Sequence, residues 1–448
     1  MTTAKENVHV KLDAKPLRVG IVGFGTVGSG TLRVLQRNQA EIQRRLGRPI
    51  IVTDVANRRI EKIEALAEEG IRIHTDPLAV AKHPDVDVVV EVMGGTTVAK
   101  EVILAAVAQG KSVVTANKAL LALHGATIFD AARKAGVDIG FEASVAGGIP
   151  ILKVLREGLT ANRIEWVAGI INGTSNFILS EMRSKGLDFS TALADAQRLG
   201  YAEADPTFDV EGIDAAHKLS ILSAMAFGTA IQFEKVHTEG IRQLQSVDIR
   251  YAESLGYRVK LLGLTRRTPH GIELRVHPAL VPATCLLAQV DGAKNAVMVQ
   301  GDAVGPTLYV GAGAGSEPTA SAVVADLIDV ARETQALAQR VTPPLAFGVQ
   351  TALPVLPISE VETSFYLRFP VTDRSGVVAE LTRILAEHHI SLSAMLQKPV
   401  QEAGGLVDVI MLTHRVKESA VQAALRVIED LPSVHQPVIR LHVETLEA

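Results

Sequence analysis

The chain has 448 residues, of which 47% are hydrophobic and 21% are charged, a composition typical of a globular protein with about three domains. Its formal net charge of -4 argues against nucleic acid as a partner. The single cysteine, Cys285, excludes an intramolecular disulfide framework and a multi-cysteine metal site, and it favours a reducing, cytoplasmic location. The N-terminus lacks the apolar core of a signal peptide and no uninterrupted apolar stretch of about 18 residues follows, so we expect no membrane partner.

The first predicted elements are a strand over 17–22 and a helix over 26–35. They flank the segment GFGTVG, which places Gly23, Gly25 and Gly28 in a G-x-G-x-x-G pattern. In such a loop the first glycine permits a sharp turn, the second lets the backbone approach a pyrophosphate, and the third allows close packing of helix on strand. The helix N-terminus would attract the anion. A glycine turn that holds no ligand is the alternative.

Strand-like and helix-like segments then alternate, which predicts a parallel sheet covered by helices on both faces. The strands are expected in IIVTDVANRR, DVDVVVEVMGG and KSVVTANKALL, with helices over 61–69 and 99–109 between them. We therefore expect residues 1–141 to form a Rossmann-like NAD(P)-binding domain.

The residues after the second strand bear on the choice of cofactor. A site that prefers NAD usually has a carboxylate there, whereas this chain has Asn57, Arg58 and Arg59. The two arginines suit the extra phosphate of NADP. Solvated arginines without a ligand are the alternative, and NAD then remains open as a cofactor. Asp54 lies inside the strand, where a structural role is expected.

Lys118 follows the strand in VVTANK, at the carboxyl edge of the predicted sheet. Ligands of open α/β folds bind at this edge, so Lys118 is a candidate ligand of the cofactor or the substrate. A solvent-facing lysine at the start of the next helix is the alternative.

Residues 142–315 contain longer helices and alternating strands, which predict a mixed α+β domain that holds the substrate. In GYAEADPTFDVEGIDAAHKLSIL, Asp214 and Lys218 are four apart and share one helix face, and Glu203 precedes them on a loop. A surface salt bridge is one interpretation of this pair. The apolar neighbours of Lys218 favour another, a buried lysine facing a carboxylate at a functional site.

The last part of the chain has three segments. A helix over 316–342 is apolar on one face, and we expect it to complete the first domain. The proline-rich segment 343–360 is predicted to be a linker. Residues 361–448 carry the element order βαββαβ of a ferredoxin-like domain.

Six motifs occur in order along nearly the whole chain: GFGTVG, VVTANK, FEASVAGGIPIL, INGTSNFIL, GYAEADPTFDVEGIDAAHKL and GAGAGSEPTASAVVADL. Together they resemble the homoserine dehydrogenase family. The resemblance implies reversible, NAD(P)-dependent interconversion of L-aspartate 4-semialdehyde and L-homoserine, on the route to threonine, methionine and isoleucine. Because no kinase-sized segment precedes residue 17, we expect the monofunctional type. Asn57 and Arg58 depart from the Arg-Asp pair of the family and leave the cofactor preference open.

The resemblance also assigns roles at the reacting carbonyl. Lys218 would be the proton donor, Lys118 would contact cofactor and substrate and share in the proton transfer, and Glu203 and Asp214 would hold the substrate. Reduction of an aldehyde builds negative charge on its oxygen, which a charged lysine stabilises. Burial would lower the pKa of Lys218 enough for it to act as a base in the opposite direction.

Further ligands follow from the same resemblance. A structural sodium ion is expected on Glu142, Val145, Gly147 and Ile149, since hard oxygen donors suit a hard cation. The expected cofactor contacts are Gly23, Gly25, Thr26, Val27, Gly28, Arg58, Thr96, Lys118, Gly200 and Gly315. The tail resembles an ACT domain, a regulatory module that binds amino acids, with DRSG at its ligand-facing turn. We expect L-threonine as its effector and a homodimer or homotetramer as the assembly.

Two other functions stay open at this point. Oxidation of an aldehyde through a thioester needs a cysteine nucleophile, and Cys285 lies in PATCLLAQV, an apolar setting that favours an inert thiol. A non-catalytic sensor of NADP and amino acids would contain the same Rossmann-like and ACT-like domains.

Overall fold

The computed structural model describes residues 15–333, 345–397 and 405–446. The chain divides into a first unit, Met1–Gly158 with Ala312–Gln350, and a second unit, Leu159–Gly311 with Thr351–Ala448. Within the described ranges, no helix is long and apolar enough to cross a membrane.

The first unit is built on a parallel six-stranded sheet with the order β3-β2-β1-β4-β5-β6. Its strands are β1 (Leu17–Val22), β2 (Ile50–Ala56), β3 (Arg72–His74), β4 (Val88–Glu91), β5 (Ser112–Thr115) and β6 (Ile139–Gly140). Strand β1 lies between β2 and β4, so the strand order reverses at β1, and its carboxyl end is the point where open α/β sheets bind ligands. The predicted Rossmann-like sheet is confirmed.

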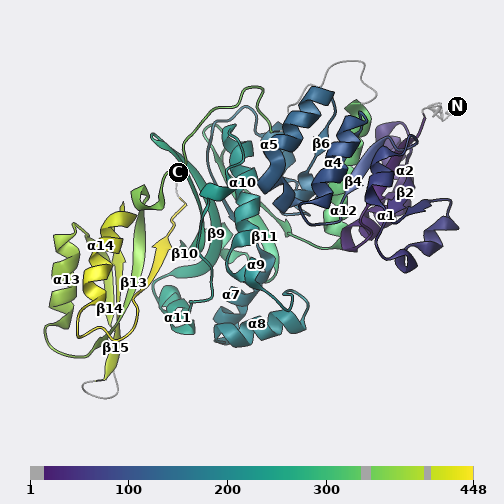
Figure 1. Ribbon diagram of the computed structural model, residues 1–448. Helices are drawn as coiled ribbons and strands as arrows, with labels where there is room; N and C mark the ends of the chain where they lie inside the picture. The colour runs from purple at the N-terminus through teal and green to yellow at the C-terminus, as the bar shows by residue number, and fades with distance from the viewer. Residues whose placement is uncertain (1–14, 334–344, 398–404, 447–448) are drawn as a thin grey trace, which may run out of the picture. The chain divides into compact units, whose positions relative to one another are not determined.

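Helices cover this sheet (Figure 1). They are α1 (Thr26–Arg37), α2 (Gln39–Leu46), α3 (Pro77–Lys82), α4 (Val98–Ala108), α5 (Lys118–Ala135) and α12 (Ser316–Glu333). Although α12 comes much later in the chain, its Val323 and Leu327 belong to the same buried cluster as Val19 and Ile21 of β1. The part of this helix expected beyond residue 333 lies outside the described residues.

The helix predicted over 61–69 is wrong. The chain forms two short 3₁₀ turns there, Ile60–Lys62 and Glu64–Ala67. The apolar residues Ile60, Ile63 and Leu66 are three apart, which matches the three residues per turn of a 3₁₀ helix, and Ile63 and Leu66 are buried.

The second unit contains an 11-stranded sheet with the main order β12-β11-β7-β9-β10-β17-β13-β15-β14. The strands of its first half are β7 (Ile164–Ile170), β8 (His237–Thr238), β9 (Tyr257–Thr268), β10 (Gly271–Pro282), β11 (Lys294–Gly301) and β12 (Gly305–Ala312). The helices there are α7 (Gly173–Lys185), α8 (Phe189–Arg198), α9 (Thr207–Val210), α10 (Ile213–Phe227) and α11 (Ser246–Ser254). Helix α10 packs against β10, β9 and β7 and is buried on every face, which explains why its sequence is apolar nearly all round.

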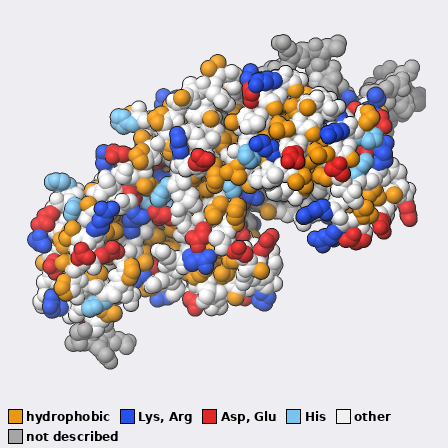
Figure 2. All heavy atoms as spheres, viewed as in Figure 1, with side chains coloured by type: hydrophobic (Ala, Val, Ile, Leu, Met, Phe, Trp, Pro, Cys, Tyr) orange, Lys and Arg blue, Asp and Glu red, His pale blue; other side chains and the backbone are white. Residues whose placement is uncertain are grey.

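The tail has the predicted ferredoxin-like order. Its elements are β13 (Glu362–Thr372), α13 (Val377–Glu387), β14 (Leu392–Gln397), β15 (Leu406–Thr413), the short β16 (Val416–Lys417), α14 (Glu418–Glu429) and β17 (Ile439–Val443). Helices α13 and α14 lie on one side of these strands (Figure 1). On the face in Figure 2, basic and acidic side chains are interspersed. Exposed pairs of this kind, such as Glu41 with Arg45 in the first unit, contribute little to stability.

The tail is continuous with the rest of the second unit, because β17 runs parallel to β10 and pairs Ala279 with His442 and Leu280 with Val443. Residues on the approach to the tail also follow β10: the Ile272 amide donates to Pro354 and the Leu356 amide donates to Ile272, both at 2.9 Å. Within the predicted linker, therefore, this stretch is hydrogen-bonded to the sheet.

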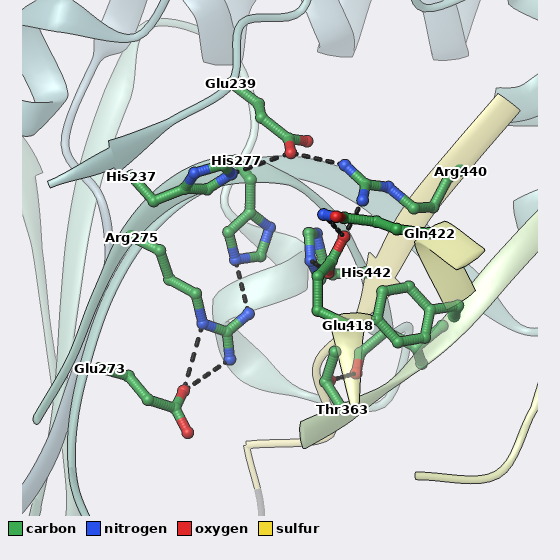
Figure 3. Close-up of polar contacts among 12 residues, drawn as sticks. His237, Glu239, Glu273, Arg275, His277, Thr363, Glu418, Gln422, Arg440 and His442 are labelled. Carbon is green, nitrogen blue, oxygen red and sulfur yellow. Dashed lines mark hydrogen bonds and ion pairs between the residues drawn. The ribbon is translucent and has the colours of Figure 1, made fainter. Parts of the chain in front are cut away.

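A buried polar network fills this junction (Figure 3). The junction network comprises Glu239, Glu273, Arg275, His277, Glu418, Arg440, His442 and Glu444. Arg275 is fully buried and donates hydrogen bonds to Glu273 at 2.8 Å and to Glu444 at 2.5 Å. Arg440 of β17 pairs with Glu239 and with Glu418 (Figure 3). Polar residues at alternate positions of β10 face the network, so a strand with both faces buried still carries charge.

Candidate active site

The glycine loop of the first unit lies between the end of β1 and the start of α1. Gly23 has φ +99°, and a Cβ there would lie 2.6 Å from the Met93 backbone. A Cβ on Gly28 would lie 2.1 Å from the carbonyl oxygen of Gly23. Around Gly25, in contrast, no atom lies within 4 Å of the Cβ position. Two glycines are thus required by close backbone contacts and the middle one borders open space, an arrangement that fits a pyrophosphate beside the helix N-terminus.

The other residues expected around a cofactor fall into both units. In the first unit, Thr26 and Val27 begin α1, Thr96 lies in the loop between β4 and α4, and Gly315 directly precedes α12. Gly200 belongs to the second unit, where it follows α8.

Arg58 and Arg59 come after β2 and Asn57, and both are exposed. Neither side chain forms a hydrogen bond or an ion pair with the described residues, so both guanidinium groups are available for an anion. Asn57 donates to the carbonyl of Arg59 at 2.9 Å and so shapes this turn.

Asp54 has the structural role that its place inside β2 predicts. It is fully buried, and it accepts hydrogen bonds from Arg72 at 2.8 Å and from His74 at 2.8 Å. Burial by itself would raise the pKa of Asp54, but hydrogen bonds from Arg72, Thr53 and His74 outweigh burial and lower the pKa to about 2. This carboxylate stabilises the β2–β3 edge and is not free to hold a ribose.

Lys118 is the first residue of α5 and comes just after β5, at the carboxyl edge of the sheet as predicted. The side chain of Asn117 caps this helix and also donates to the carbonyl of Gly95 at 2.7 Å. Sequence reasoning missed Glu91, whose buried carboxylate at the end of β4 accepts a 2.7 Å hydrogen bond from Thr115. The signal was an acidic residue at the end of the apolar run VVV, in the segment VVVE.

Glu142, expected to bind sodium, is buried and accepts hydrogen bonds from the amides of Leu152 at 3.0 Å and Lys153 at 2.8 Å. Burial and the nearby Asp326 raise the pKa of Glu142 to about 8. A buried carboxyl beside a second one is a setting that a cation would stabilise, so the donor chemistry fits a hard cation such as sodium. The backbone of Val145, Gly147 and Ile149 belongs to the same turn, in which Ala146 has φ +50°.

The densest cluster of polar contacts predicted from the sequence lies in the second unit, at the start of α10. The Lys218 ammonium donates to Asp214 at 2.6 Å and to the carbonyl of Ile171 at 2.7 Å. Lys218 is 8% exposed and Asp214 is 7% exposed, so the pair is buried and the surface salt bridge is excluded. Charged groups of this kind are expensive to bury without partners, which makes them candidates for chemistry.

Two residues of this cluster were missed from the sequence. Asn172 lies just after β7 and donates to Asp209 at 2.7 Å and to Asp214 at 2.9 Å. Burial raises the pKa of the Asp209 carboxyl, and the neighbouring Asp214 adds to the effect. Asp209 stands in the charged segment already noted, but the turn at Gly212 breaks the helical spacing that would have paired it with Asp214.

Glu203, the other expected substrate ligand, is not brought into contact with this pair. Its side chain is exposed and forms no hydrogen bond or ion pair with the described residues, while its carbonyl accepts a 3.1 Å bond from Gln197. Cys285 is half-buried and packs against the apolar cluster of Trp166 and Leu262. Its setting is the apolar one expected for an inert thiol.

Comparison with known proteins shows the family to which the chain belongs. The family model described as homoserine dehydrogenase, NAD binding domain, matches residues 23–142, the model described as homoserine dehydrogenase matches 150–328, and the ACT domain model matches 365–433. A homoserine dehydrogenase of Pseudomonas aeruginosa is 55% identical over 435 residues, which is 96% of this chain and 100% of that protein.

Solved structures give the same result. The crystal structure of a homoserine dehydrogenase from Thiobacillus denitrificans has a TM-score of 0.92 and 59% identity, and covers 97% of this chain and 99% of that one. A hyperthermophilic archaeal homoserine dehydrogenase in complex with NADPH has a TM-score of 0.61 and 26% identity, and covers 73% of this chain and 100% of that one. The chain therefore belongs to the homoserine dehydrogenase family of NAD(P)-dependent oxidoreductases.

Proposed function

We propose that Lys218 transfers the proton in the interconversion of L-aspartate 4-semialdehyde and L-homoserine. The observation that carries this proposal is the buried ammonium of Lys218, held by Asp214 and by the Ile171 carbonyl. When bound, the nicotinamide supplies or accepts the hydride. In the reducing direction, the charged Lys218 would stabilise and protonate the carbonyl oxygen as negative charge grows on it. In the oxidising direction, the neutral amine would remove the hydroxyl proton.

The substitution Lys218→Ala tests this role. General acid–base catalysis typically contributes about 10²–10⁴-fold, so kcat for homoserine oxidation should fall by that factor while NADP affinity stays near the wild-type value. Lys260→Met is a matched control, because Lys260 is also buried but bonds to the Val290 carbonyl and to Asp291. A loss below tenfold in Lys218→Ala would leave Lys218 with a structural role only.

Asp214, which bonds to Lys218, is also proposed to bind the substrate. Glu203 is proposed to bind the substrate from its exposed loop. Lys118 is proposed to contact the cofactor and the substrate from the N-terminus of α5. The substitution Glu203→Gln should raise KM for homoserine more than KM for NADP, and equal changes would contradict a substrate contact.

NADP is the cofactor that the exposed arginines after β2 favour. Arg58 and Arg59 have no acidic partner among the described residues, and guanidinium groups bind phosphate strongly. A related archaeal enzyme was solved with NADPH. Removal of both side chains in Arg58→Ala with Arg59→Ala should lower kcat/KM for NADP much more than for NAD; an equal loss would contradict the assignment.

A sodium ion is proposed to stabilise the turn after Glu142, with the Glu142 carboxylate and the carbonyls of Val145, Gly147 and Ile149 as donors. Its role is structural. The measurement is the thermal midpoint in sodium chloride against choline chloride at equal ionic strength, for wild type and for Glu142→Gln. Sodium should stabilise only the wild type.

The ACT domain is proposed to bind L-threonine at the turn 373–376. Gly376 has φ +94° and no described side chain caps the N-terminus of α13, so backbone amides there suit a carboxylate. Ser375→Asp should weaken threonine inhibition, whereas Ser419→Asp, which adds the same charge at the start of α14, should not. An unchanged response in Ser375→Asp would place the effector elsewhere.

A homodimer or homotetramer is also proposed. Strand β12 is at the end of the sheet order, and Val310 on it is 50% exposed, as expected for an edge that pairs with another copy. Sedimentation at micromolar concentration distinguishes these assemblies from a monomer.

A further inference from the structure

The side chain of Asn172 has each of its hydrogen-bonding groups occupied at the candidate site. It is 5% exposed, and its oxygen accepts a 2.8 Å bond from the Ser175 amide, which caps α7. Its amide nitrogen donates one bond to Asp209 at 2.7 Å and one to Asp214 at 2.9 Å. The orientation of the amide follows from these partners, because a flipped side chain would face two carboxylates with its oxygen.

The amide of Asn172 therefore forms a bridge between two carboxylates of like charge, Asp209 and Asp214. Asp209 and Asp214 come from α9 and α10, and the ammonium of Lys218 bonds to Asp214. One oxygen of Asp214, Oδ2, accepts both the Asn172 amide and the Lys218 ammonium. The direction in which Asp214 points is therefore set from two sides.

Lys218 is also fixed by the residue next to Asn172. The carbonyl of Ile171 accepts the second bond of the ammonium at 2.7 Å. The two residues at the end of β7 thus hold Lys218 directly through one carbonyl and indirectly through Asp214. Asn172 bonds to Asp214, so its effect on Lys218 passes through that carboxylate.

We propose that Asn172 is a positioning residue for proton transfer at Lys218, a step that rests on the proposed function of Lys218. By bridging Asp209 and Asp214 it keeps the Asp214 carboxylate directed at the ammonium. Without the bridge the two carboxylates move apart and the ammonium loses its fixed position. Misplacement of a reacting group by about 1 Å costs up to about 100-fold in rate.

Two substitutions separate this role from helix capping. Asn172→Ser and Asn172→Asp both keep an oxygen that caps α7, since Ser, Asp and Asn are comparable at this position. Both remove the side-chain amide that donates to the two carboxylates, and the single, shorter hydroxyl of Ser can donate to at most one of them. Asn176→Ser is the matched control, because Asn176 is buried in the same helix and donates instead to the carbonyls of Val290 and Gly292.

The expected result has two parts. In both Asn172 variants, kcat for homoserine oxidation falls about 10- to 100-fold, while KM for NADP stays near wild type. The thermal midpoint stays near wild type in Asn172→Ser and falls in Asn172→Asp, which buries a further carboxylate. In Asn172→Asp, a third carboxylate joins Asp209 and Asp214 around Lys218 and favours its charged form. The acidic limb of the kcat profile therefore moves to higher pH, because the base must lose its proton. Asn176→Ser changes the thermal midpoint and leaves the pH profile unchanged.

Other outcomes overturn the proposal. A kcat within threefold of wild type and an unshifted pH profile in both Asn172 variants would show that Asp214 needs no bridge. If both variants failed to fold while Asn176→Ser folded, the bridge to Asp209 and Asp214 would be needed for folding, and Asn172 would be a structural residue instead of a positioning one. If the Asn172 variants behaved as wild type but Lys218→Ala lost activity, only this inference would fail. If Lys218→Ala kept its activity, the proposed function itself would fail.

Discussion

Lys218 and Asp214 show which contacts of the site a sequence can predict. Residues four apart on a helix share a face, so their pairing follows from local geometry, and the structure confirms it. Asn172 precedes Asp214 by 42 residues, and Asp209 is separated from it by a turn. Their contacts depend on how β7, α9 and α10 pack together, which no local pattern contains. The role of Glu203 as a substrate ligand stays a prediction, because its exposed side chain has no partner among the described residues.

Asp54 carries a prediction at the same scale, because its native pKa is about 2 and its ordinary value is 3.8. A carboxyl whose pKa is lowered by folding adds stability above pH 4, and this contribution is lost as the pH falls toward 2. We expect Asp54→Asn to lower the free energy of unfolding by about 2 kcal/mol at pH 7 and to flatten its dependence on pH between 4 and 2.

The measurement for Asp54 is denaturant unfolding at a series of pH values. Asp130→Asn is the control, because Asp130 is 43% exposed and pairs with Arg133 and Lys134 on the surface of α5. It should change stability little at any pH. An acid dependence of Asp54→Asn equal to that of wild type would mean that the pair with Arg72 contributes nothing.

At the scale of elements, the sequence predicts those helices and strands whose apolar residues recur with a regular period and whose ends carry a recognisable signal. The glycine loop, the alternation of strands and helices and the βαββαβ tail are confirmed for this reason. The 60–67 segment deviates because apolar residues three apart suit 3₁₀ turns as well as a helix. The segment of β10 could be predicted to form a strand. That both of its faces are buried could not be predicted, because the strand contains charged residues. In the tail, Arg275 pairs with Glu444, just after β17, and His277 packs against His442 of β17.

Arg275 of β10 gives the prediction for this scale. Its removal in Arg275→Met takes from the buried Glu273 and Glu444 their hydrogen-bonded guanidinium and leaves them the more distant Arg266, at 3.8 and 3.6 Å. Breaking a buried ion pair typically costs about 3–5 kcal/mol. Arg242→Met is the control, since Arg242 is 50% exposed and forms a surface pair with Glu211. Thermal unfolding compares the two variants. A midpoint of Arg275→Met that matches the control would show that the junction network does not stabilise the second unit.

At the scale of the whole molecule, composition and motif order predicted an enzyme with three kinds of domain, and the family models confirm them. The sequence did not show that the tail and the rest of the second unit share one sheet. This follows from a short parallel pairing between β10 and β17 that has no signature in either strand.

The shared sheet leads to a prediction about deletion of the tail. A chain that ends at residue 350 lacks β17, so the edge of β10 is open at Ala279 and Leu280, and Arg275 and His277 lose their partners in the tail. Open strand edges promote aggregation. We expect a low yield of soluble protein and a lower thermal midpoint than for the full chain, measured by calorimetry after expression of both. A deletion variant with the midpoint of the full chain would mean that the junction is dispensable for folding.

The pairing of β10 with β17 also sets the order in which the protein can fold during its synthesis. Strand β10 leaves the ribosome long before β17. On the side that β17 later occupies, β8 pairs with Arg275 and Val276, but Ala279 and Leu280 wait for β17. Contacts between segments so distant in sequence form slowly, because a long loop must close before they stabilise anything. The second unit is therefore exposed to misassembly until the tail is made, whereas the parallel sheet of the first unit can assemble from residues synthesised early and then take up α12.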